Sequence, residues 1–426
     1  MAMGMGSGFR LGAAISDANW TTVGSGVNNK VWALAVSGSN VYAGGDFTNA
    51  GGSAANYIAK WDGSSWSALG SGMNYTVRAL AVSGTNLYAG GDFTMAGGNL
   101  AYHVARWNGS SWSALGAGVG SFMSGSVSAL AVSGTNLYAA GGFGTAGGFT
   151  ANNIAKWNGS SWSALGLGVN GTVYGLAVSG SDVYAGGLFT SAGGSTANYI
   201  AKWNGSSWSA LGSGMGNSPD STPVYALAAS GTSLYAGGLF WSAGGQGVNS
   251  IARWNGSSWS AVGSLTVSTN YIPSVYALAV SGSDLYAGGD FTKAGGSAVN
   301  RIAKWDGSSW TGLGSGMNTN VFALAVSGSD LYVGGAFTAA GGKACAYIAR
   351  TYLLTLPTLS VVRSGSDVMV SWPSVDTGSF SLEQAGTLAD PASWVPNAAS
   401  VADDGTNKSV TDPATDSAQF FRLRRP

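Results

Sequence analysis

A motif of the form V-x-[AG]-L-A-[VA]-S-G occurs seven times and sets the strongest limit on how this chain can fold. Its copies recur every 46–51 residues, beginning at Val31, Val77, Val127, Val173, Val224, Val275 and Val321. Self-similarity at a period of this length is typical of solenoids, propellers and other repeat architectures. The repeat therefore constrains the fold far more tightly than it constrains the function.

Each repeat has the pattern of four short strands. In the copy at 275–318, two apolar runs at 275–281 and 285–291 precede a loop rich in Gly, Ala and Ser, and further runs begin at Ile302 and Trp310. Asp306-Gly307 lies between the last two runs, and such a pair is the strongest short signal for a hairpin because both turn residues tolerate positive φ. Four strands in 40–50 residues are typical of one blade of a β-propeller.

A second motif, W-[ST]-x-[LV]-G, marks the fourth strand and shows how the ring closes. It also occurs seven times, but its first copy, at Trp20, precedes every first-strand motif, and the last repeat ends near Arg350 without one. The segment around Trp20 is therefore predicted to supply the missing outer strand of the last blade, which removes an open sheet edge. We predict seven blades, six continuous and one shared, rather than a solenoid, which needs polar capping repeats at both ends.

The composition changes after the propeller, predicted at 17–352. Residues 351–426 hold 13 of the 36 charged residues but only four of the 70 glycines. Short strand-like runs separated by turn residues predict a small β-sandwich at 360–426, with Trp372 and the pair Phe420-Phe421 in its core. Residues 353–359 form a predicted linker, and residues 1–16 a flexible tail without the pattern of a signal peptide. The fold class is thus all-β.

The overall composition excludes several classes of protein. The formal net charge is zero and only 8% of residues are charged, so no basic patch indicates nucleic acid as a partner. No apolar run of about 20 residues predicts a membrane span, and the single Cys345 cannot form an intrachain disulfide. No cofactor is expected. The many Ser, Thr, Gly and Asn residues fit a bacterial protein that is extracellular or at the cell surface, monomeric unless it belongs to a surface assembly.

Two stretches resemble known repeat families. The order Gly44-Gly45, then Trp61-Asp62-Gly63-Ser64-Ser65-Trp66, resembles Kelch-type propeller repeats, although the second hairpin is shorter and Trp replaces the usual Tyr. The phrase ALAVSG…LYAGGDFT…IAKWNGSSWSALGSG is similar to Kelch-like propellers of bacterial secreted proteins and of the fungal cortical polarity-marker family. The C-terminal SGSDVMVSWP…QFFRLRRP is similar to small fibronectin-III-like modules of secreted bacterial proteins. These resemblances imply export, and binding or scaffolding rather than a reaction.

The longest loops should share one face of the ring. In a four-stranded meander, the connection from strand two to three and the connection from strand four to the next blade lie on the same side, which we call the long-loop face. All insertions lie there, at 117–126, 213–223 and 264–274, and insertions on one face of a repeat protein usually mark its binding face. Candidate ligand-binding residues on this face are Phe122, Asp220, Trp241, Asn270 and Tyr271.

An Asp follows the second-strand Gly-Gly pair in only three blades. These are Asp46, Asp92 and Asp290, and the other blades have Gly142, Leu188, Leu239 and Ala336. One hypothesis is that the three Asp side chains bind a polar ligand or a cation such as calcium. The alternative is that each caps backbone N–H groups in its own loop.

Two further positions are assigned structural roles. A basic residue precedes the third-strand aromatic in every repeat, at Lys60, Arg106, Lys156, Lys202, Arg253, Lys304 and Arg350, and its stem is expected to cover apolar surface. His103, the only histidine, occupies a position that varies between repeats, so we expect it at an exposed loop edge.

The inventory of reactive residues argues against an enzyme. The first 350 residues contain no Glu and ten Asp, five of them in hairpin turns, whereas glycosidases need a carboxylate pair and hydrolytic triads need a His. The sequence therefore predicts a non-catalytic secreted or cell-surface binding or scaffold protein that engages a protein or a polysaccharide through the long-loop face. The alternatives are a structural protein of a surface assembly and a multivalent lectin-like sugar binder.

Overall fold

The computed structural model describes residues 15–121, 124–216, 223–267, 272–353, 359–374, 381–386, 394–413 and 419–424. They divide between two compact units, one within Ala14–Leu353 and the other within Leu354–Pro426. The named strands of the described residues all pair antiparallel, as expected of an all-β protein built from hairpins, and an isolated bridge between Asn249 and Ser264 is parallel.

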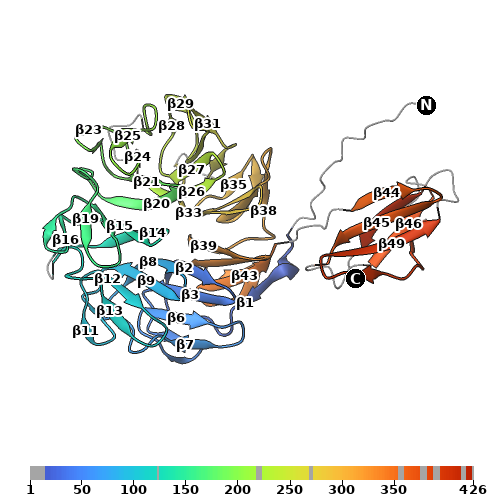
Figure 1. The fold of residues 1–426 in the computed structure, drawn as a ribbon, viewed down its shortest axis with the longest axis horizontal. Helices are drawn as coiled ribbons and strands as arrows, with labels where there is room; N and C mark the ends of the chain where they lie inside the picture. The colour runs from blue at the N-terminus through green and yellow to red at the C-terminus, as the bar shows by residue number, and fades with distance from the viewer. Residues whose placement is uncertain are drawn as a thin grey trace. The chain divides into compact units, whose positions relative to one another are not determined.

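Six four-stranded sheets of the larger unit are continuous in sequence, and we call them blades 1–6 (Figure 1). From the innermost strand outward, blades 1–3 are β2 (Val31–Ser37), β3 (Asn40–Gly45), β6 (Ile58–Trp61) and β7 (Trp66–Ala68); β8 (Val77–Ser83), β9 (Asn86–Gly91), β12 (Val104–Trp107) and β13 (Trp112–Ala114); and β14 (Val127–Ser133), β15 (Asn136–Gly141), β18 (Ile154–Trp157) and β19 (Trp162–Ala164).

Blades 4–6 follow the same order. They are β20 (Val173–Ser179), β21 (Asp182–Gly187), β24 (Ile200–Trp203) and β25 (Trp208–Ala210); β26 (Val224–Ser230), β27 (Ser233–Gly238), β30 (Ile251–Trp254) and β31 (Trp259–Ala261); and β33 (Val275–Ser281), β34 (Asp284–Gly289), β37 (Ile302–Trp305) and β38 (Trp310–Gly312).

The seventh blade takes its outer strand from the other end of the unit. β39 (Val321–Ser327), β40 (Asp330–Gly335) and β43 (Ile348–Tyr352) are completed by β1 (Trp20–Thr22), which follows the short 3-10 helix η1 (Asp17–Asn19). Trp20 lies opposite Thr351 in this pairing, and innermost strand β2 contacts both β8 and β39. The seven-bladed propeller closed by an N-terminal strand is therefore confirmed.

The fourth-strand tryptophans connect each blade to the preceding one. The indole Nε1 of Trp66 donates to the carbonyl of Val23, 2.8 Å away, and that of Trp20 to Leu313 at 3.0 Å. The same bond, at 2.7–2.9 Å, joins Trp112 to Leu69, Trp162 to Leu115, Trp208 to Leu165, Trp259 to Leu211 and Trp310 to Val262. Seven hydrogen bonds of one kind thus run around the ring. In this series β1 donates through Trp20, and Val23, which directly follows β1, accepts. We call these seven residues the tryptophan ring.

The blades pack through alternating apolar side chains. Val31, Val41 and Phe47 of blade 1 are fully buried, and their counterparts in the other blades are buried as well, because alternate residues of a strand point to the same face of the sheet. Gly44 lets the neighbouring blade approach closely, since a Cβ there would lie 2.5 Å from Cγ1 of Val77. Repetition of this spacing produces a separate core cluster between each pair of blades.

Short hairpins on the long-loop face contact the loop that enters each blade. Asn28 shows how: its side-chain Oδ1 accepts from the backbone N–H groups of Thr48 and Asn49, each at 2.9 Å. Asn74, Asn170 and Asn318 do the same in blades 2, 4 and 7. The hairpin strands are β4 (Asn49–Ala50) and β5 (Ser53–Ala54), β10 (Met95–Ala96) and β11 (Asn99–Leu100), β16 (Thr145–Ala146) and β17 (Phe149–Thr150), β22 (Ser191–Ala192) and β23 (Ser195–Thr196), β28 (Ser242–Ala243) and β29 (Gln246–Gly247), β35 (Lys293–Ala294) and β36 (Ser297–Ala298), and β41 (Ala339–Ala340) and β42 (Lys343–Ala344), with β32 (Leu265–Thr266) added beside β35.

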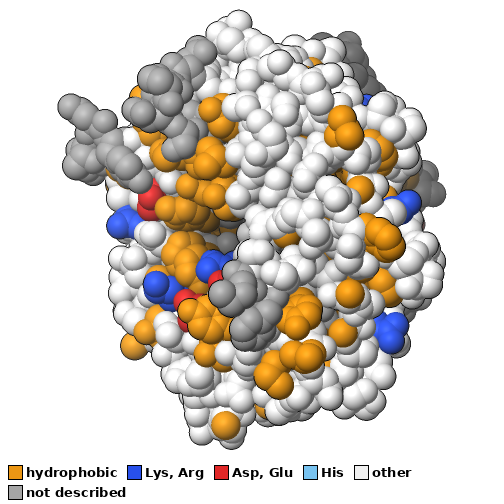
Figure 2. Space-filling view, turned by 90° about the vertical axis from the view of Figure 1, so that its left-hand side faces the viewer, with side chains coloured by type: hydrophobic (Ala, Val, Ile, Leu, Met, Phe, Trp, Pro, Cys, Tyr) orange, Lys and Arg blue, Asp and Glu red, His pale blue; other side chains and the backbone are white. Residues whose placement is uncertain are grey.

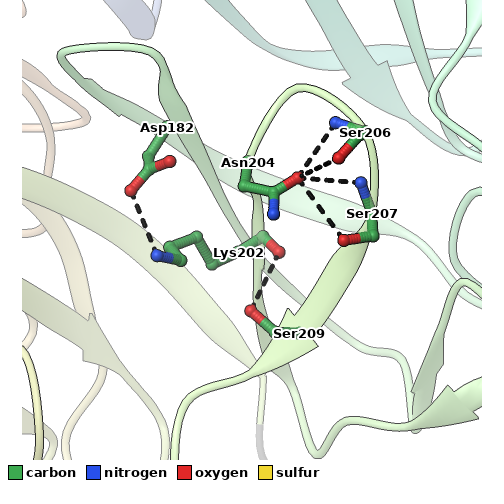
Figure 3. Close-up of polar contacts among 6 residues, drawn as sticks. All are labelled: Asp182, Lys202, Asn204, Ser206, Ser207 and Ser209. Carbon is green, nitrogen blue, oxygen red and sulfur yellow. Dashed lines mark hydrogen bonds and ion pairs between the residues drawn. The ribbon is translucent and has the colours of Figure 1, made fainter.

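The opposite face carries tight turns. In blade 4, the side-chain oxygen of Asn204 accepts the N–H groups of Ser206 and Ser207 at 2.9 and 2.8 Å (Figure 3). Lys202, one of the basic residues of the third strand, forms an ion pair with Asp182 of the other turn at 3.1 Å. Lys304 with Asp284 and Arg350 with Asp330 repeat this pair. The basic residue thus joins the two hairpins of its own blade.

The smaller unit is a two-sheet sandwich. One sheet has the order β44 (Ser360–Ser364), β45 (Asp367–Pro373), β49 (Asn407–Pro413), β48 (Ala402–Asp403), and the other β47 (Val395–Pro396), β46 (Ser381–Ala385), β50 (Phe420–Arg424). Trp372 and Val410 of the first sheet pack with Leu382 of the second, and Phe421 lies against them. Trp372 and Phe421 therefore occupy the predicted core, whereas Phe420 is outside this cluster.

Candidate functional site

The second residue of each innermost strand interrupts the regular pairing. Val31 pairs with Gly45 and Ala33 with Gly44, so Trp32 is an extra residue at a bulge between them. The same register shift recurs in all seven blades. Bulges re-aim side chains and are frequent beside functional sites. The residues at these bulges, which we call the channel ring, are Trp32, Arg78, Ser128, Tyr174, Tyr225, Tyr276 and Phe322.

The channel ring surrounds a cavity of about 700 Å³. All seven of its residues contribute to the lining, together with Asp92, Ser126, Gly142, Thr172 and Asn320, which lie where the long-loop face meets the ends of the first and second strands. Figure 2 shows a hollow on the molecule, where hydrophobic side chains gather next to basic and acidic ones. We call this space the channel-mouth cavity.

One side of the cavity is an arc of five aromatic rings. Successive ring centroids are 5.5 Å apart between Tyr174 and Tyr225, 5.4 Å between Tyr225 and Tyr276, and 5.4 Å between Tyr276 and Phe322. Phe322 in turn stacks on Trp32 at 4.2 Å. Each contact joins neighbouring blades, and the three at 5.4–5.5 Å fall in the range of favourable aromatic pairs. All five side chains are half-buried, so the arc offers an apolar wall that solvent still reaches.

The other side of the cavity, in blades 2 and 3, is polar. Arg78 Nε lies 2.8 Å from both carboxylate oxygens of Asp92, and Nη2 lies 2.7 Å from Oδ2. Ser126 donates its hydroxyl to Asp92 at 2.7 Å. Burial raises the pKa of Asp92, but the hydrogen bonds from Arg78 and Ser126 outweigh this effect and hold the pKa below its ordinary value. Asp92 is therefore a paired, ionised carboxylate at neutral pH.

The other two Asp candidates contact the aromatic arc. Asp46 accepts a 2.9 Å hydrogen bond from the indole Nε1 of Trp32 and a 2.8 Å bond from the hydroxyl of Thr76 in the next blade. Asp290 accepts from the Ser274 N–H at 2.6 Å, and the hydroxyl of Tyr276 lies 3.4 Å from it. Loop capping therefore describes only Asp290, while Asp46 and Asp92 bridge neighbouring blades through side-chain donors.

Of the five loop candidates, Trp241 is the one among the described residues. Trp241 is 45% exposed and does not line the channel-mouth cavity. Phe122, Asp220, Asn270 and Tyr271 lie outside the described residues. Of the eight candidates, Asp92 lines the channel-mouth cavity, and Asp46 and Asp290 accept hydrogen bonds from the lining residues Trp32 and Tyr276.

Sequence reasoning missed the channel ring itself. Its signal was present as the x of V-x-[AG]-L-A, the position that changes from Trp to Arg, Ser, Tyr and Phe inside an otherwise uniform motif. When one position varies inside a repeated motif, its side chain does not take part in the core packing that requires the same residue type at the other positions. The sequence could not show the role of this position, because only the bulge reveals that its side chain points into the channel.

The expectation for His103 is wrong. Its side chain is only 3% exposed, and its Nε2 lies 3.0 Å from the carbonyl of Ser121 in the entering loop of blade 3. Its φ is 62°, and the counterparts in the other six blades also have positive φ. The position varies between repeats because the backbone conformation is shared while the side chain meets a different loop in each blade.

Comparisons with known proteins add similarity of fold. No model of a known protein family matches the chain, and no curated protein matches it. Similar solved structures include the computationally designed Ika8 protein (16% identity, 77% of this chain and 97% of that chain, TM-score 0.43) and YjhT (15%, 65% and 95%, TM-score 0.40). The designed Ika4 protein matches 44% of this chain and 94% of its own at 15% identity, TM-score 0.28. At these scores the propeller architecture rests on the strand pairing itself.

Among the described residues, no three His, Cys, Asp or Glu side chains lie together in a way that suits a metal ion. No helix in the same part of the chain is long and apolar enough to cross a membrane.

Proposed function

We propose that the protein is a non-catalytic binding or scaffold protein, secreted or exposed at a cell surface, that engages a polysaccharide or a protein through the long-loop face of its propeller. The observation that carries the proposal is the channel-mouth cavity, which opens on that face. A concave site with an apolar wall and a few convergent polar groups is the usual form of a ligand site. The Kelch-like and fibronectin-III-like resemblances support export, with the sandwich as a spacer or attachment module.

The carboxylates at and beside the cavity support binding rather than catalysis. Asp46, Asp92 and Asp290 each accept hydrogen bonds from protein donors. A general acid or base needs a carboxylate that exchanges its proton near the working pH, whereas pairing with Arg78 favours the ionised form of Asp92. These contacts suit groups that hold the cavity in shape.

A multivalent sugar-binding function is the second candidate, and one observation favours it. A groove of about 580 Å³ in blade 5 is lined by Trp254 and Trp259, whose ring centroids are 5.4 Å apart. The same pairs, Trp61 with Trp66, Trp107 with Trp112, Trp157 with Trp162, Trp203 with Trp208 and Trp305 with Trp310, recur in the other continuous blades at 5.4–5.6 Å. Stoichiometry separates the two functions, since the first gives about one ligand per chain and the second several.

The test is titration of the full chain with a panel of bacterial and plant polysaccharides, with and without calcium, followed by tryptophan fluorescence. Tyr75 is 57% exposed in the loop that enters blade 2, so the double variant Tyr75→Ala, Trp241→Ala alters the long-loop face. Ser181→Ala on the opposite face is the matched control. We expect a saturable change that the double variant weakens and the control retains. If no polysaccharide of the panel changes the fluorescence, a polysaccharide is excluded as the partner. If the control variant alone loses binding, the interaction lies on the face opposite the long loops.

A further inference from the structure

We propose that the channel-mouth cavity binds one uncharged pyranose ring, the terminal sugar of a glycan, with a single such site per chain. This inference rests on the proposed binding function and names its ligand class. The charges, the shape and the blade-to-blade asymmetry of the cavity favour a neutral sugar over a protein as the ligand.

The two charged side chains that line the cavity, Arg78 and Asp92, are paired with each other. Asp46 and Asp290 do not line it, and they accept hydrogen bonds from Trp32 and Thr76 and from Ser274. A bound anion would have to compete with Asp92 for Arg78, and a bound cation with Arg78 for Asp92. Burying an unpaired charge is costly. The cavity therefore suits a ligand without net charge.

The two sides of the cavity match the two kinds of surface on a pyranose. The aromatic arc from Tyr174 to Trp32 provides flat apolar area for the C–H face of a sugar ring, and Tyr combines that area with a hydroxyl. On the other side, Asp92 accepts and Arg78 donates, and Nη1 of Arg78 is not among the atoms that bind Asp92. Such paired acceptors and donors bind neighbouring hydroxyl groups and fix the orientation of the ring.

The size and composition of the cavity indicate one composite site. A volume of about 700 Å³ lies within the range of small-molecule sites and admits a monosaccharide or the end of a chain. The seven blades contribute Trp, Arg, Ser, three Tyr and Phe to the channel ring. The ring of channel residues therefore has no rotational symmetry, and a ligand on the axis finds one preferred orientation. A lectin with one site per blade would instead need the same residues in each blade.

Isothermal titration calorimetry of the full chain tests the inference. The probes are the methyl glycosides of glucose, galactose, mannose and N-acetylglucosamine, with glucuronate and tetramethylammonium as charged comparisons. We expect at least one neutral glycoside to bind with a stoichiometry near one and at least tenfold more tightly than either charged probe. Tyr225→Ala removes apolar wall and Ser128→Tyr fills the polar side, so each should weaken binding at least tenfold. Circular dichroism establishes that both variants are folded.

Phe149→Ala is the control, because this side chain is 76% exposed and does not line the cavity. The affinity of this variant should equal that of the unaltered chain. Several glycosides per chain, tighter binding of a charged probe, or full affinity in folded Ser128→Tyr would overturn the inference. Saturable polysaccharide binding without response to any glycoside would also overturn it while leaving the proposed function intact. Failure of both titrations would remove the polysaccharide form of that function as well.

Discussion

The tryptophan ring and the channel ring occupy equivalent positions in all seven blades, yet they differ in almost every respect. The outer ring has the same residue seven times, and each indole makes the same hydrogen bond to the preceding blade. The inner ring contains five residue types, and its contacts differ from blade to blade. Uniformity marks the positions that hold blades together, and variety marks the positions that packing leaves free for a ligand.

The tryptophan ring should dominate stability, so its loss has the largest expected effect. Trp20→Ala removes a side chain that is 1% exposed and the hydrogen bond to Leu313 that closes the ring. We expect a loss of about 3–5 kcal/mol in the free energy of unfolding, measured by urea denaturation followed by circular dichroism. Trp241→Ala is the matched control, since its exposed indole should cost less than about 1 kcal/mol. Equal effects of the two changes would contradict the closing role of β1.

Arg78 of the channel ring should have a smaller effect that depends on pH. Arg78→Met leaves the Asp92 carboxylate with its bond from Ser126 but without its counterion, which should cost about 1 kcal/mol at pH 7. The pKa of Asp92 is lowered in the folded state, so the stabilisation by Arg78 is present above the ordinary pKa of 3.8 and is lost as pH falls through the folded value. The difference in melting temperature between the variant and the unaltered chain should therefore shrink below about pH 4. A constant difference down to pH 2 would argue against the ion pair as the cause.

Ser128 provides a sharper comparison of binding with stability. Ser128→Tyr adds an aromatic ring beside a cavity that already holds five, at a half-buried bulge position. The free energy of unfolding should change by less than about 1 kcal/mol, although the cavity becomes smaller. Thermal denaturation checks this expectation. A loss as large as that of Trp20→Ala would show that the channel ring, too, is part of the packing.

The smallest expected effect concerns the turns of the opposite face. Burial raises the pKa of Asp306, but hydrogen bonds from Ser309 and Ser308 outweigh it and bring the pKa to about 2. Because the folded pKa is depressed, the contribution of Asp306 is present above about pH 4 and is lost as pH falls towards 2. Asp306→Asn should keep the turn, since Asn204 makes the same bonds, and should flatten the fall in melting temperature over this interval. An unchanged slope would mean that other carboxylates cause the acid sensitivity.

Much of the scaffold could be predicted because repetition averages out local ambiguity. A single copy of W-[ST]-x-[LV]-G says little, but seven copies with one displaced to Trp20 predict both the number of blades and the closing strand, which the pairing of β1 with β43 confirms. The site was only partly predictable. Of the three unusual Asp residues, Asp92 lines the cavity, and Asp46 and Asp290 bond to residues that line it. Trp241 lies away from the lining.

The sequence by itself thus determined the strand order, the seven-bladed ring and the face that carries the long loops, because hydrogen-bonded hairpins and apolar alternation are local and recur in every repeat. Only the tertiary structure decided which varied position faces the channel. Trp32 and Tyr174 are 142 residues apart in sequence. They belong to one aromatic arc because a bulge in each innermost strand turns its side chain towards the channel, and because closure of the ring brings these bulges together. Contacts of that kind depend on how the blades surround a common axis, which no single repeat encodes.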